Sequence, residues 1–498
     1  MTPPSAGENS VNKLKVVIIG AGPTCFGALH RLFQLCNNGL VDNTEVRVIE
    51  QESEPGGLAR TITDPNGFSW DLGVHVTGAS KYPEFLEVLQ KAVPKWNAVR
   101  RCVKADMSHA VGENDGPMAS SSSVPNAASN YVPYPVQNSI PYFANHLKEK
   151  CLADFEQLSK IANGKPNFDD NFDDFSRKIF GPTLQSIFIR PYNEKVWTVK
   201  LKDMSCKWVE GRVPRIDPDL IRRRCAISRE QLALEEEMKE TQTIFRYPAE
   251  CKGIGEIWKR LVAAFPNEIF LFGQQVVNID PIKKEVWTKS DENQENHSYS
   301  YDVLISTIPI TQLGKLCGLA PEIPLRHSKV VLVGVGLHLP QSELARELSW
   351  AYYPRPEIIF YRCTLLSNFS LELTPDSTKY WSVLCEIGTK PDDEVDEELA
   401  IQRTVQDLIA VGIVESAGQV CSTWLQILPY GYPVPSIERD QVLDECHKIF
   451  LQHGMFSRGR FGGWRYEISN QDHSFECGVQ LVDRILLGIP ETLYQSPL

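Results

Sequence analysis

Hydrophobic and polar positions near the start of the chain predict a strand, a tight turn, a helix and a second strand. Residues 13–20 form a short apolar run that is rich in β-branched side chains and ends in glycine. Residues 45–50 repeat this pattern and end in an acid, and the segment between the two runs reads as a helix. Such a strand–turn–helix–strand unit is typical of the nucleotide-binding domain of an α/β protein.

The pattern continues with helices in the first half of the chain and strands in the second. Residues 68–76 alternate like a strand, 141–188 read mainly as helices, and 245–258 read as a loop leading into a helix. Further strands are predicted at 269–272, 276–279, 302–307, 329–337 and 380–387. We expect 302–307 to return to the first sheet, and the last two to form a second, mostly antiparallel sheet.

Near the C-terminus, a glycine-containing strand from Gly459 leads through a polar stretch into a final helix that ends near Leu487. Asp472 or Ser474 is expected to cap this helix, leaving its first N–H groups for a ligand.

Composition excludes several classes of protein. With 42% hydrophobic and 23% charged residues the chain is an ordinary globular protein, and 498 residues predict two or three domains. A net charge of −12 argues against a general nucleic-acid or anionic-membrane binder. Thirteen scattered cysteines without a C-x-x-C pair favour reduced thiols and a cytoplasmic location, and the ten histidines show no metal-ligand spacing. No signal peptide or membrane span is predicted.

The first turn carries the clearest chemistry. It reads Gly20-Ala-Gly22-Pro23-Thr24-Cys25, in which the two glycines let the backbone approach a pyrophosphate at the helix N-terminus. Glu50 ends the second strand, where an acid accepts ribose hydroxyls. The third position of the usual G-x-G-x-x-G pattern is Cys25, which is small enough for close packing. An ordinary βα turn is the alternative.

A Gly56-Gly57 doublet follows Glu50 closely, and adjacent glycines permit positive φ angles and close backbone approach. This is the position at which FAD needs a second backbone contact, and a plain turn is the alternative. His75 lies at the end of the predicted strand 68–76. A histidine at such a position is, by itself, more often structural than catalytic.

Taken together, the motifs resemble the eukaryotic-type UDP-galactopyranose mutases, with some divergence. The matching stretches occur in family order from about residue 14 to 488 and are G-A-G-P-T, P-G-G-L-A, Y-P-x-Q-N, R-P-Y-N-x-K-V-W, F-R-Y-P-A, F-Y-R, G-Y-P and G-R-F-G-x-W-R-Y-E-x-x-N-Q-D-H-S-F. The resemblance implies an α/β fold: a discontinuous Rossmann-like FAD-binding domain, a helical domain and a mostly antiparallel β-sheet substrate domain.

The segments expected on this basis follow the chain in order. They are 13–103, the first part of the FAD-binding domain; 104–130, a flexible insertion rich in Ser, Gly and Pro; 131–225, the substrate-loop and helical domain; 226–310, the return to the FAD-binding domain; 311–455, the antiparallel sheet substrate domain; and 456–490, the C-terminal FAD-binding segment and helix.

The resemblance also implies a reaction. FAD, reduced by NADPH or NADH, attacks the anomeric carbon of a UDP-sugar through N5, and the pyranose and furanose forms interconvert. Cations must stand near the leaving diphosphate, where charge accumulates. The expected partner is therefore a small molecule, a UDP-sugar, with no nucleic acid or membrane; a homo-oligomer is left open.

Site residues are carried over from the motifs. The catalytic set is His75, Arg190 and Arg362, the last two as the diphosphate-binding arginines, and no metal ligand is expected. Substrate binding falls to Tyr134, Gln137, Arg190, Trp350, Tyr352, Arg362, Tyr432, Tyr466 and Asn470. Cofactor binding falls to Gly20, Gly22, Pro23, Thr24, Glu50, Gly56, Gly57, Leu58, Val74, Arg460, Asn470, Gln471 and Ser474.

Four positions depart from the family pattern. Val74 replaces a glycine before the histidine and resists a backbone flip, and Gly78 replaces an aromatic. Val136 removes a stacking face from the uridine loop, and Phe369 removes a tyrosine hydroxyl near the phosphate. These departures leave three readings: a UDP-sugar mutase, an FAD-dependent oxidoreductase acting on another small molecule in specialised metabolism, or a catalytically idle FAD-binding scaffold.

Overall fold

The structure, a computed structural model, describes residues 13–41, 44–78, 80–111, 127–161, 168–209, 212–213, 216–290 and 294–494. Contacts divide the chain into two compact units, each built from separate stretches of sequence. The first comprises the described residues within 1–57, 258–324 and 440–498, and the second those within 58–257 and 325–439. The predicted functional roles of the segments remain predictions.

A parallel sheet forms the centre of the first unit, with the strand order β19-β13-β1-β2-β9. Its strands are β1 (Leu14–Ile19), β2 (Thr44–Ile49), β9 (Phe270–Leu271), β13 (Val303–Ser306) and β19 (Met455–Ser457). Val16 of β1 lies between Val46 of β2 and Val303 of β13. The predicted return of residues 302–307 to the first sheet is therefore confirmed.

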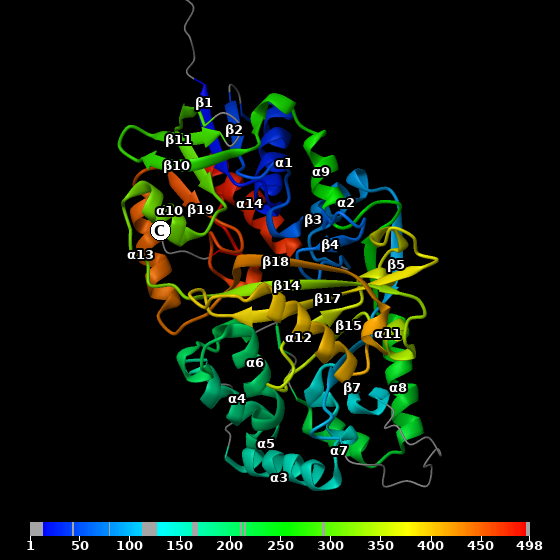
Figure 1. Ribbon diagram of the computed structural model, residues 1–498. Helices are drawn as coiled ribbons and strands as arrows, with labels where there is room; N and C mark the ends of the chain where they lie inside the picture. The colour runs from blue at the N-terminus through cyan, green and yellow to red at the C-terminus, as the bar shows by residue number, and fades with distance from the viewer. Residues whose placement is uncertain are drawn as a thin grey trace, which may run out of the picture. The chain divides into compact units, whose positions relative to one another are not determined.

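Helices α1 (Pro23–Asn37) and α14 (Gln471–Leu487) lie side by side, although they come from opposite ends of the chain (Figure 1). A Cβ on Gly27 would lie 1.8 Å from the carbonyl oxygen of Phe475, and one on Gly478 would lie 2.1 Å from that of Thr24. Only glycine permits so close an approach of two backbones. Gly27 and Gly478 thus allow α1 and α14 to pack closely, while Cys25, expected to permit close helix–strand packing, is fully buried.

The other elements of the first unit are an antiparallel ribbon and three helices. The ribbon has the order β10-β11-β12. The bounds are β10 (Gln274–Asp280), β11 (Glu285–Ser290), β12 (Asn296–Ser300), α10 (Ile310–Cys317), α9 (Glu256–Val262) and α13 (Arg439–Leu451). The first residues of α9 and of α13 are counted in the second unit and the rest of both helices in the first.

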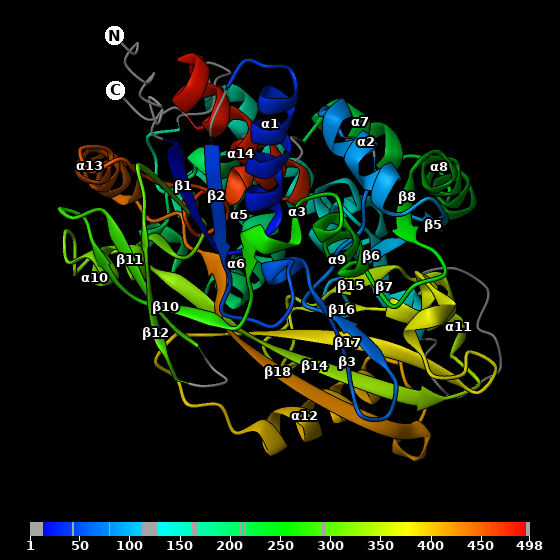
Figure 2. The same cartoon turned by 90° about the horizontal axis from the view of Figure 1, so that it is seen from above.

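A largely antiparallel sheet forms the centre of the second unit, with the order β18-β14-β17-β16-β15-β6-β7 and one parallel pair, β15 with β6. Figure 2 shows its long strands with α12 (Glu397–Ala410) beside them. The bounds are β6 (Val103–Asp106), β7 (Tyr131–Pro133), β14 (His327–His338), β15 (Trp350–Tyr352), β16 (Arg362–Thr364), β17 (Tyr380–Thr389) and β18 (Val420–Pro433). The predicted second sheet is confirmed.

Side chains alternate across β14 and pack differently on its two faces. Val331, Val333 and further odd-numbered residues belong to the buried core that includes Leu408 of α12. On the opposite face, Gly334 and Gly336 lie so close to the rings of Trp70 and Phe68 that a Cβ would come within 2.7 and 2.6 Å of them. Alternation thus buries one face and makes room for aromatic rings on the other.

Helices and two short ribbons complete the second unit. The ribbons pair β3 (Thr61–Thr63) with β4 (Ser69–Asp71), and β5 (Trp96–Arg100) with β8 (Ile244–Pro248). The helices are α2 (Pro83–Ala92), α3 (Asn145–Ile161), α4 (Phe172–Phe180), α5 (Pro182–Leu184), α6 (Arg190–Trp197), α7 (Pro218–Cys225), α8 (Arg229–Gln242) and α11 (Glu343–Glu347). A π-helical turn, Gln185–Ile189, directly precedes α6.

Three sequence expectations need correction. The strand expected over 68–76 ends at Asp71, so His75 lies in irregular chain beyond it. Residues 244–248 pair with β5 as a strand where a loop was expected. The insertion expected to begin at 104 begins later, since 103–106 pair with β15 and β7 as β6; its central residues, 112–126, lie outside the described part of the chain.

Candidate functional site

The two predicted glycine segments come together in the first unit. Gly20 follows β1 with a φ of +92°, and a Cβ there would lie 2.3 Å from Oγ1 of Thr307. Gly56 and Gly57 have φ angles of +113° and +54°. A Cβ on Gly57 would lie 3.6 Å from Cα of Gly22. The backbone thus forms a cradle that side chains would fill, as a bound pyrophosphate requires.

Helix α1 starts at this cradle. Gly22 is its N-cap, Pro23 occupies the first turn, and no side chain among the described residues caps it. The first N–H groups, including that of Thr24, and the positive end of the helix dipole therefore favour an anion.

Glu50 holds the turn from the end of β2. Its buried carboxylate accepts hydrogen bonds from the backbone N–H groups of Ala21 (2.7 Å) and Glu52 (3.0 Å). Burial, reinforced by the Glu50 charge, raises the pKa of the Cys25 thiol, so this side chain stays neutral. The expected contact of Glu50 with ribose remains a prediction, while the structure shows that it fixes the turn.

The C-terminal segment lies against the start of α1. Gly459 has a φ of +90°, and a Cβ there would lie 2.6 Å from Oγ1 of Thr24. Nη1 of Arg460 lies 3.3 Å from Oγ of Ser469, to which it donates, and its guanidinium lies 6.0 Å from the ring of Tyr466. Residues from both ends of the chain thus surround one helix start.

Asn470 is the N-cap of α14, which corrects the expectation that Asp472 or Ser474 caps this helix. Gln471 is its first residue, and the N–H of Ser474 donates to the carbonyl oxygen of Asn470 at 2.8 Å. The residues present fit a flavin dinucleotide, since a glycine cradle, a helix start without a side-chain cap and a buried acid occur in one compact unit.

Aromatic side chains and an arginine gather in the second unit. The ring of Tyr352 lies 4.7 Å from that of Tyr134 and 5.3 Å from that of Tyr192. Its hydroxyl accepts a hydrogen bond from Nε1 of Trp350 at 3.0 Å. Burial raises the pKa of Tyr192 and of Tyr352, so both hydroxyls stay protonated at neutral pH and able to donate.

Arg362 adjoins these aromatics through Tyr432, whose hydroxyl lies 3.3 Å from its Nη2. Nε and Nη2 of Arg362 each donate to Glu386 at 2.7 Å, across the β16–β17 pair. Burial lowers the pKa of the Arg362 guanidinium, but Glu386, together with Tyr432 and Tyr361, outweighs burial and raises the pKa above its usual value. A further side-chain hydrogen bond links Arg362 to the hydroxyl of Tyr352, so the guanidinium and the two tyrosine hydroxyls lie together.

Glu386 was not anticipated. Its side chain is 2% exposed, against 16% for that of Arg362, and it also accepts from the hydroxyl of Tyr361 at 2.6 Å. The signal in the sequence was a single acid inside the apolar run 380–387, which implies a buried partner.

Arg190 opens α6, directly after the π-helical turn, a feature that is frequent at functional sites. Its Nη2 lies 3.0 Å from Oδ1 of Asp173, and 36% of its side chain is exposed. Asp173, which sequence reasoning also missed, orients it. Tyr192 lies on the same helix as Arg190 and belongs to the aromatic group around Tyr352. Its place in the R-P-Y-N motif was the signal in the sequence that could have identified it.

Of the remaining predicted residues, Gln137 is buried in the short helix Val136–Asn138 that follows Tyr134. Leu58 lies in the 3-10 turn Gly57–Ala59. Val74 and His75 are half-buried in the chain after β4, where Gly73 has a φ of +131° and a Cβ would lie 3.6 Å from Cε1 of the histidine.

The departures from the family pattern lie mostly in packed surroundings. Val136 is fully buried, and Phe369 packs against Tyr247 with ring centroids 5.5 Å apart. A Cβ on Gly78 would lie 3.4 Å from the ring of Phe245, which in turn stacks on Trp350 at 5.5 Å. The ring of Phe245 therefore reaches the space beside Gly78.

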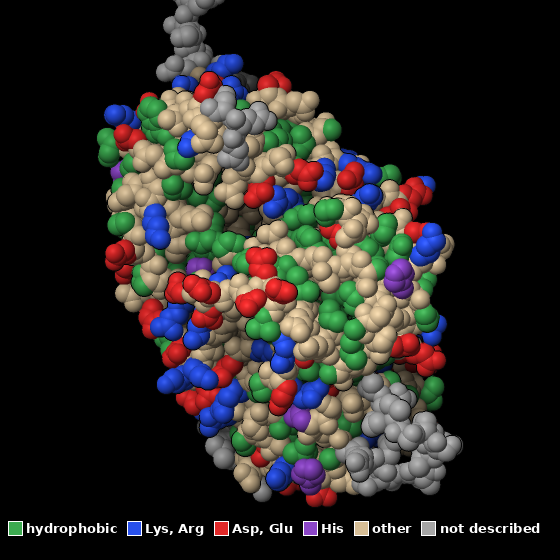
Figure 3. Space-filling model, in the orientation of Figure 1, with side chains coloured by type: hydrophobic (Ala, Val, Ile, Leu, Met, Phe, Trp, Pro, Cys, Tyr) green, Lys and Arg blue, Asp and Glu red, His purple; other side chains and the backbone are tan. Residues whose placement is uncertain are grey.

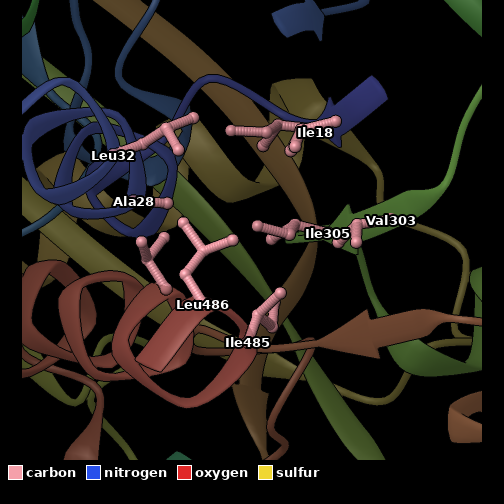
Figure 4. Close-up of a pocket in the computed structure, with 9 residues that line it drawn as sticks. Ile18, Ala28, Leu32, Val303, Ile305, Ile485 and Leu486 are labelled. Carbon is pink, nitrogen blue, oxygen red and sulfur yellow. The ribbon is translucent and has the colours of Figure 1, made fainter. Parts of the chain in front are cut away.

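Neither the face drawn in Figure 3 nor one apolar cavity adds a site among the described residues. The face in Figure 3 shows acidic and basic side chains interspersed over its described residues. A small cavity in the first unit is lined entirely by apolar side chains of β1, α1, β13 and α14, among them Ile18, Leu32 and Leu486 (Figure 4). Without polar groups to orient a ligand, it is a packing gap.

Within the described ranges, no helix is long and apolar enough to cross a membrane, and no group of three or more potential ligands is placed to hold a metal ion. Of the thirteen cysteines, Cys421 is the exposed one.

Comparison with known proteins gives one family and several related structures. Residues 33–335 match the model of the flavin-containing amine oxidoreductases. The chain is 31% identical to a reduced UDP-galactopyranose mutase, with a TM-score of 0.82, over 97% of this chain and 96% of that one. A CLA-producing fatty acid isomerase from P. acnes shares the fold at 14% identity (TM-score 0.57, 94% of this chain and 98% of that one covered). A cyclohexylamine oxidase from Brevibacterium oxydans shares it at 12% identity (TM-score 0.55, 96% and 99% covered).

Proposed function

Because this chain belongs to the flavin-containing amine oxidoreductase family, we propose that it is an FAD enzyme that interconverts the pyranose and furanose forms of a UDP-sugar. The observation that carries this proposal is the group formed by Arg362, Tyr352 and Tyr432. The 31% identity to a UDP-galactopyranose mutase over nearly the whole chain supports it.

In this proposal the first unit holds the cofactor. Gly20, Gly22 and Gly57 would bring backbone N–H groups to the pyrophosphate, and Arg460 and the start of α14 would face the flavin. When bound, FAD supplies the ring whose reduced form is the nucleophile, and NADPH or NADH supplies the electrons.

The second unit would hold the UDP-sugar. The Arg362 guanidinium and the hydroxyls of Tyr352 and Tyr432 are donors for the diphosphate, where negative charge grows as the glycosidic bond breaks. Arg190 would add a second cation, while Tyr134 and Gln137 would contact the uridine and Trp350 the sugar. Glu386 keeps Arg362 fixed, so the guanidinium needs no reorganisation during the reaction.

A spectral titration tests the binding half of this proposal. FAD-loaded protein is titrated with UDP and with UDP-galactose, in the oxidised and in the dithionite-reduced state, and the flavin absorbance is followed. Saturable changes with both ligands are expected. Absence of any change with either ligand in both states, with binding also undetectable by calorimetry, would contradict UDP-sugar recognition.

A second function is favoured by one specific observation. Val136 and Phe369 are buried apolar side chains where the family pattern expects a stacking aromatic and a phosphate-binding hydroxyl. An FAD-dependent oxidoreductase acting on another small molecule would not need either group. This alternative predicts flavin reoxidation by oxygen coupled to a non-sugar substrate, together with no protection of the flavin by UDP.

A further inference from the structure

Lys195 sits in an unusual environment on α6. Its ammonium Nζ lies 3.1 Å from the carbonyl oxygen of Tyr353, 3.0 Å from that of Arg355 and 2.7 Å from that of Phe360. The carbonyl oxygen of Ile358 is a fourth partner. All four belong to residues 353–360, the loop between β15 and β16.

The four carbonyl oxygens favour the charged form of Lys195. An ammonium has three N–H donors, so four carbonyl oxygens satisfy it fully and the remaining contact is electrostatic. A neutral amine would turn a lone pair toward carbonyl oxygens, which repel it. An apolar side chain of the same length would leave this set of inward-facing carbonyls without their donor.

The loop held by Lys195 joins the two strands that carry the candidate site. Tyr352 ends β15 immediately before the loop, and Arg362 begins β16 immediately after it. Further contacts fix the loop from outside: Arg355 donates to Asp106 at 2.8 and 3.1 Å, and the N–H of Ile359 donates to Asp407 at 2.6 Å. Lys195 supplies the link from the loop to α6.

Helix α6 carries the other half of the group. Arg190 and Tyr192 lie on it, within five residues of Lys195. The helix is seated on β17, where a Cβ on Gly388 would lie 2.4 Å from the carbonyl oxygen of Lys195. The position of α6 relative to the loop thus sets the distance between Arg190 and Tyr192 on one side and Tyr352 and Arg362 on the other.

We propose that Lys195 is a positioning residue that clamps the 353–360 loop to α6 and thereby sets the geometry of the diphosphate-binding group. The ligand part of this inference rests on the proposed function. The clamp itself does not, because it is a statement about two elements of the second unit.

The clamp has a pH signature. Burial lowers the pKa of Lys195 to about 7; Asp407 and, more weakly, Glu357 and Asp106 oppose the shift, and Arg355 adds to it. These are the charges that face the ammonium from α12, the loop and β6. The ammonium loses its proton as pH rises above this value, and the clamp weakens in the same range.

The test compares three variants of the full, FAD-loaded chain with the wild type. Lys195→Met removes the charge at similar length, Lys195→Arg keeps a charge at every accessible pH, and Lys200→Met makes the same change to a lysine that is 69% exposed and pairs with Glu194 at 2.9 Å. UDP-galactose is the ligand, since its diphosphate has no second ionisation near neutrality. Affinity is measured by calorimetry from pH 6 to 9, and amide exchange over 353–361 by mass spectrometry.

We expect Lys195→Met to bind UDP-galactose about tenfold or more weakly than the wild type at pH 6.5. Wild-type affinity falls above pH 7, whereas that of Lys195→Arg changes little with pH. Amide exchange over 353–361 becomes faster in Lys195→Met than in the wild type, by more than exchange in β14 does. Lys200→Met matches the wild type in both affinity and exchange. If Lys195→Met is not recovered folded, the pH profile of Lys195→Arg carries the test.

Unchanged affinity together with unchanged exchange in Lys195→Met would overturn the inference, as would faster exchange with unchanged affinity. If the wild type binds no UDP-galactose, the proposed function fails, and the exchange comparison alone decides the clamp. Faster exchange in Lys195→Met than in Lys200→Met would then support it, and equal exchange would overturn it.

Discussion

Replacing Arg362 by methionine separates two roles that its side chain combines. The guanidinium balances the charge of Glu386 through two hydrogen bonds of 2.7 Å, and its Nη1 group faces away from that pair. Methionine keeps an apolar stem but removes the charge. The variant therefore changes both the stability of the second unit and the affinity for a diphosphate, and each change has its own expected size.

The stability effect follows from the burial of Glu386. With its side chain 2% exposed, the carboxylate would lose its cation and remain in a poorly hydrated position. Breaking such a pair costs about 3–5 kcal/mol, and we expect the lower end because Arg362 is itself 16% exposed. The double variant Arg362→Met/Glu386→Gln should recover most of this loss, because no uncompensated charge is left.

The binding effect should not recover. Loss of two charge-assisted hydrogen bonds to a diphosphate costs about 2–4 kcal/mol, which is about a 30- to 900-fold weaker dissociation constant. Urea denaturation measures the first effect, and calorimetry with UDP at a temperature where all variants are folded measures the second. A dissociation constant for UDP that is the same in wild type, single and double variants would refute the placement of Arg362 at the diphosphate.

Three further predictions concern packing, pH and the departures. Gly27→Ala should cost about 3 kcal/mol in urea denaturation, because its Cβ would lie 1.8 Å from the Phe475 carbonyl oxygen; a loss no larger than that of Gly418→Ala, where the nearest atom is 3.7 Å away, would contradict this. Burial raises the pKa of Asp71 to about 6, although the hydrogen bonds that its carboxylate accepts lower the pKa. Between about pH 4 and 6 the folded state holds a proton that the unfolded state releases, so this group's contribution to stability falls as pH rises; the free energy of unfolding of wild type minus that of Asp71→Asn should be larger at pH 4.5 than at pH 7.5, and a constant difference would count against it. Phe369→Tyr should lose about 1–2 kcal/mol of stability without gaining affinity for UDP, since Phe369 is buried; tighter binding with unchanged stability would show that the ring faces the ligand.

Local sequence patterns predicted the elements whose physical causes are local. The β-branched run before Gly20, the return strand 302–307 and the two long antiparallel strands all occur as expected. The glycines that the turn requires have the positive φ angles that motivated the prediction. These features follow from backbone sterics and side-chain alternation within a few residues.

Partners distant in sequence could not be predicted this way. Arg362 meets Glu386 only because of the register between β16 and β17, and Lys195 meets the 353–360 loop only because α6 lies on β17. The over-long strand at 68–76 has a similar cause. Asp71 is buried and accepts from the hydroxyls of Thr61 and Tyr247, and the chain then turns at Gly73. Tertiary contacts end that strand where alternation alone would continue it.

The most direct test of the proposed function is turnover of UDP-galactofuranose. FAD-loaded protein is reduced with dithionite under anaerobic conditions and incubated with the substrate, and the products are separated by chromatography, with oxidised protein as the control. We expect UDP-galactopyranose from the reduced protein and none from the oxidised protein. Absence of the pyranose in the reduced sample, with FAD bound and UDP binding intact, would contradict it.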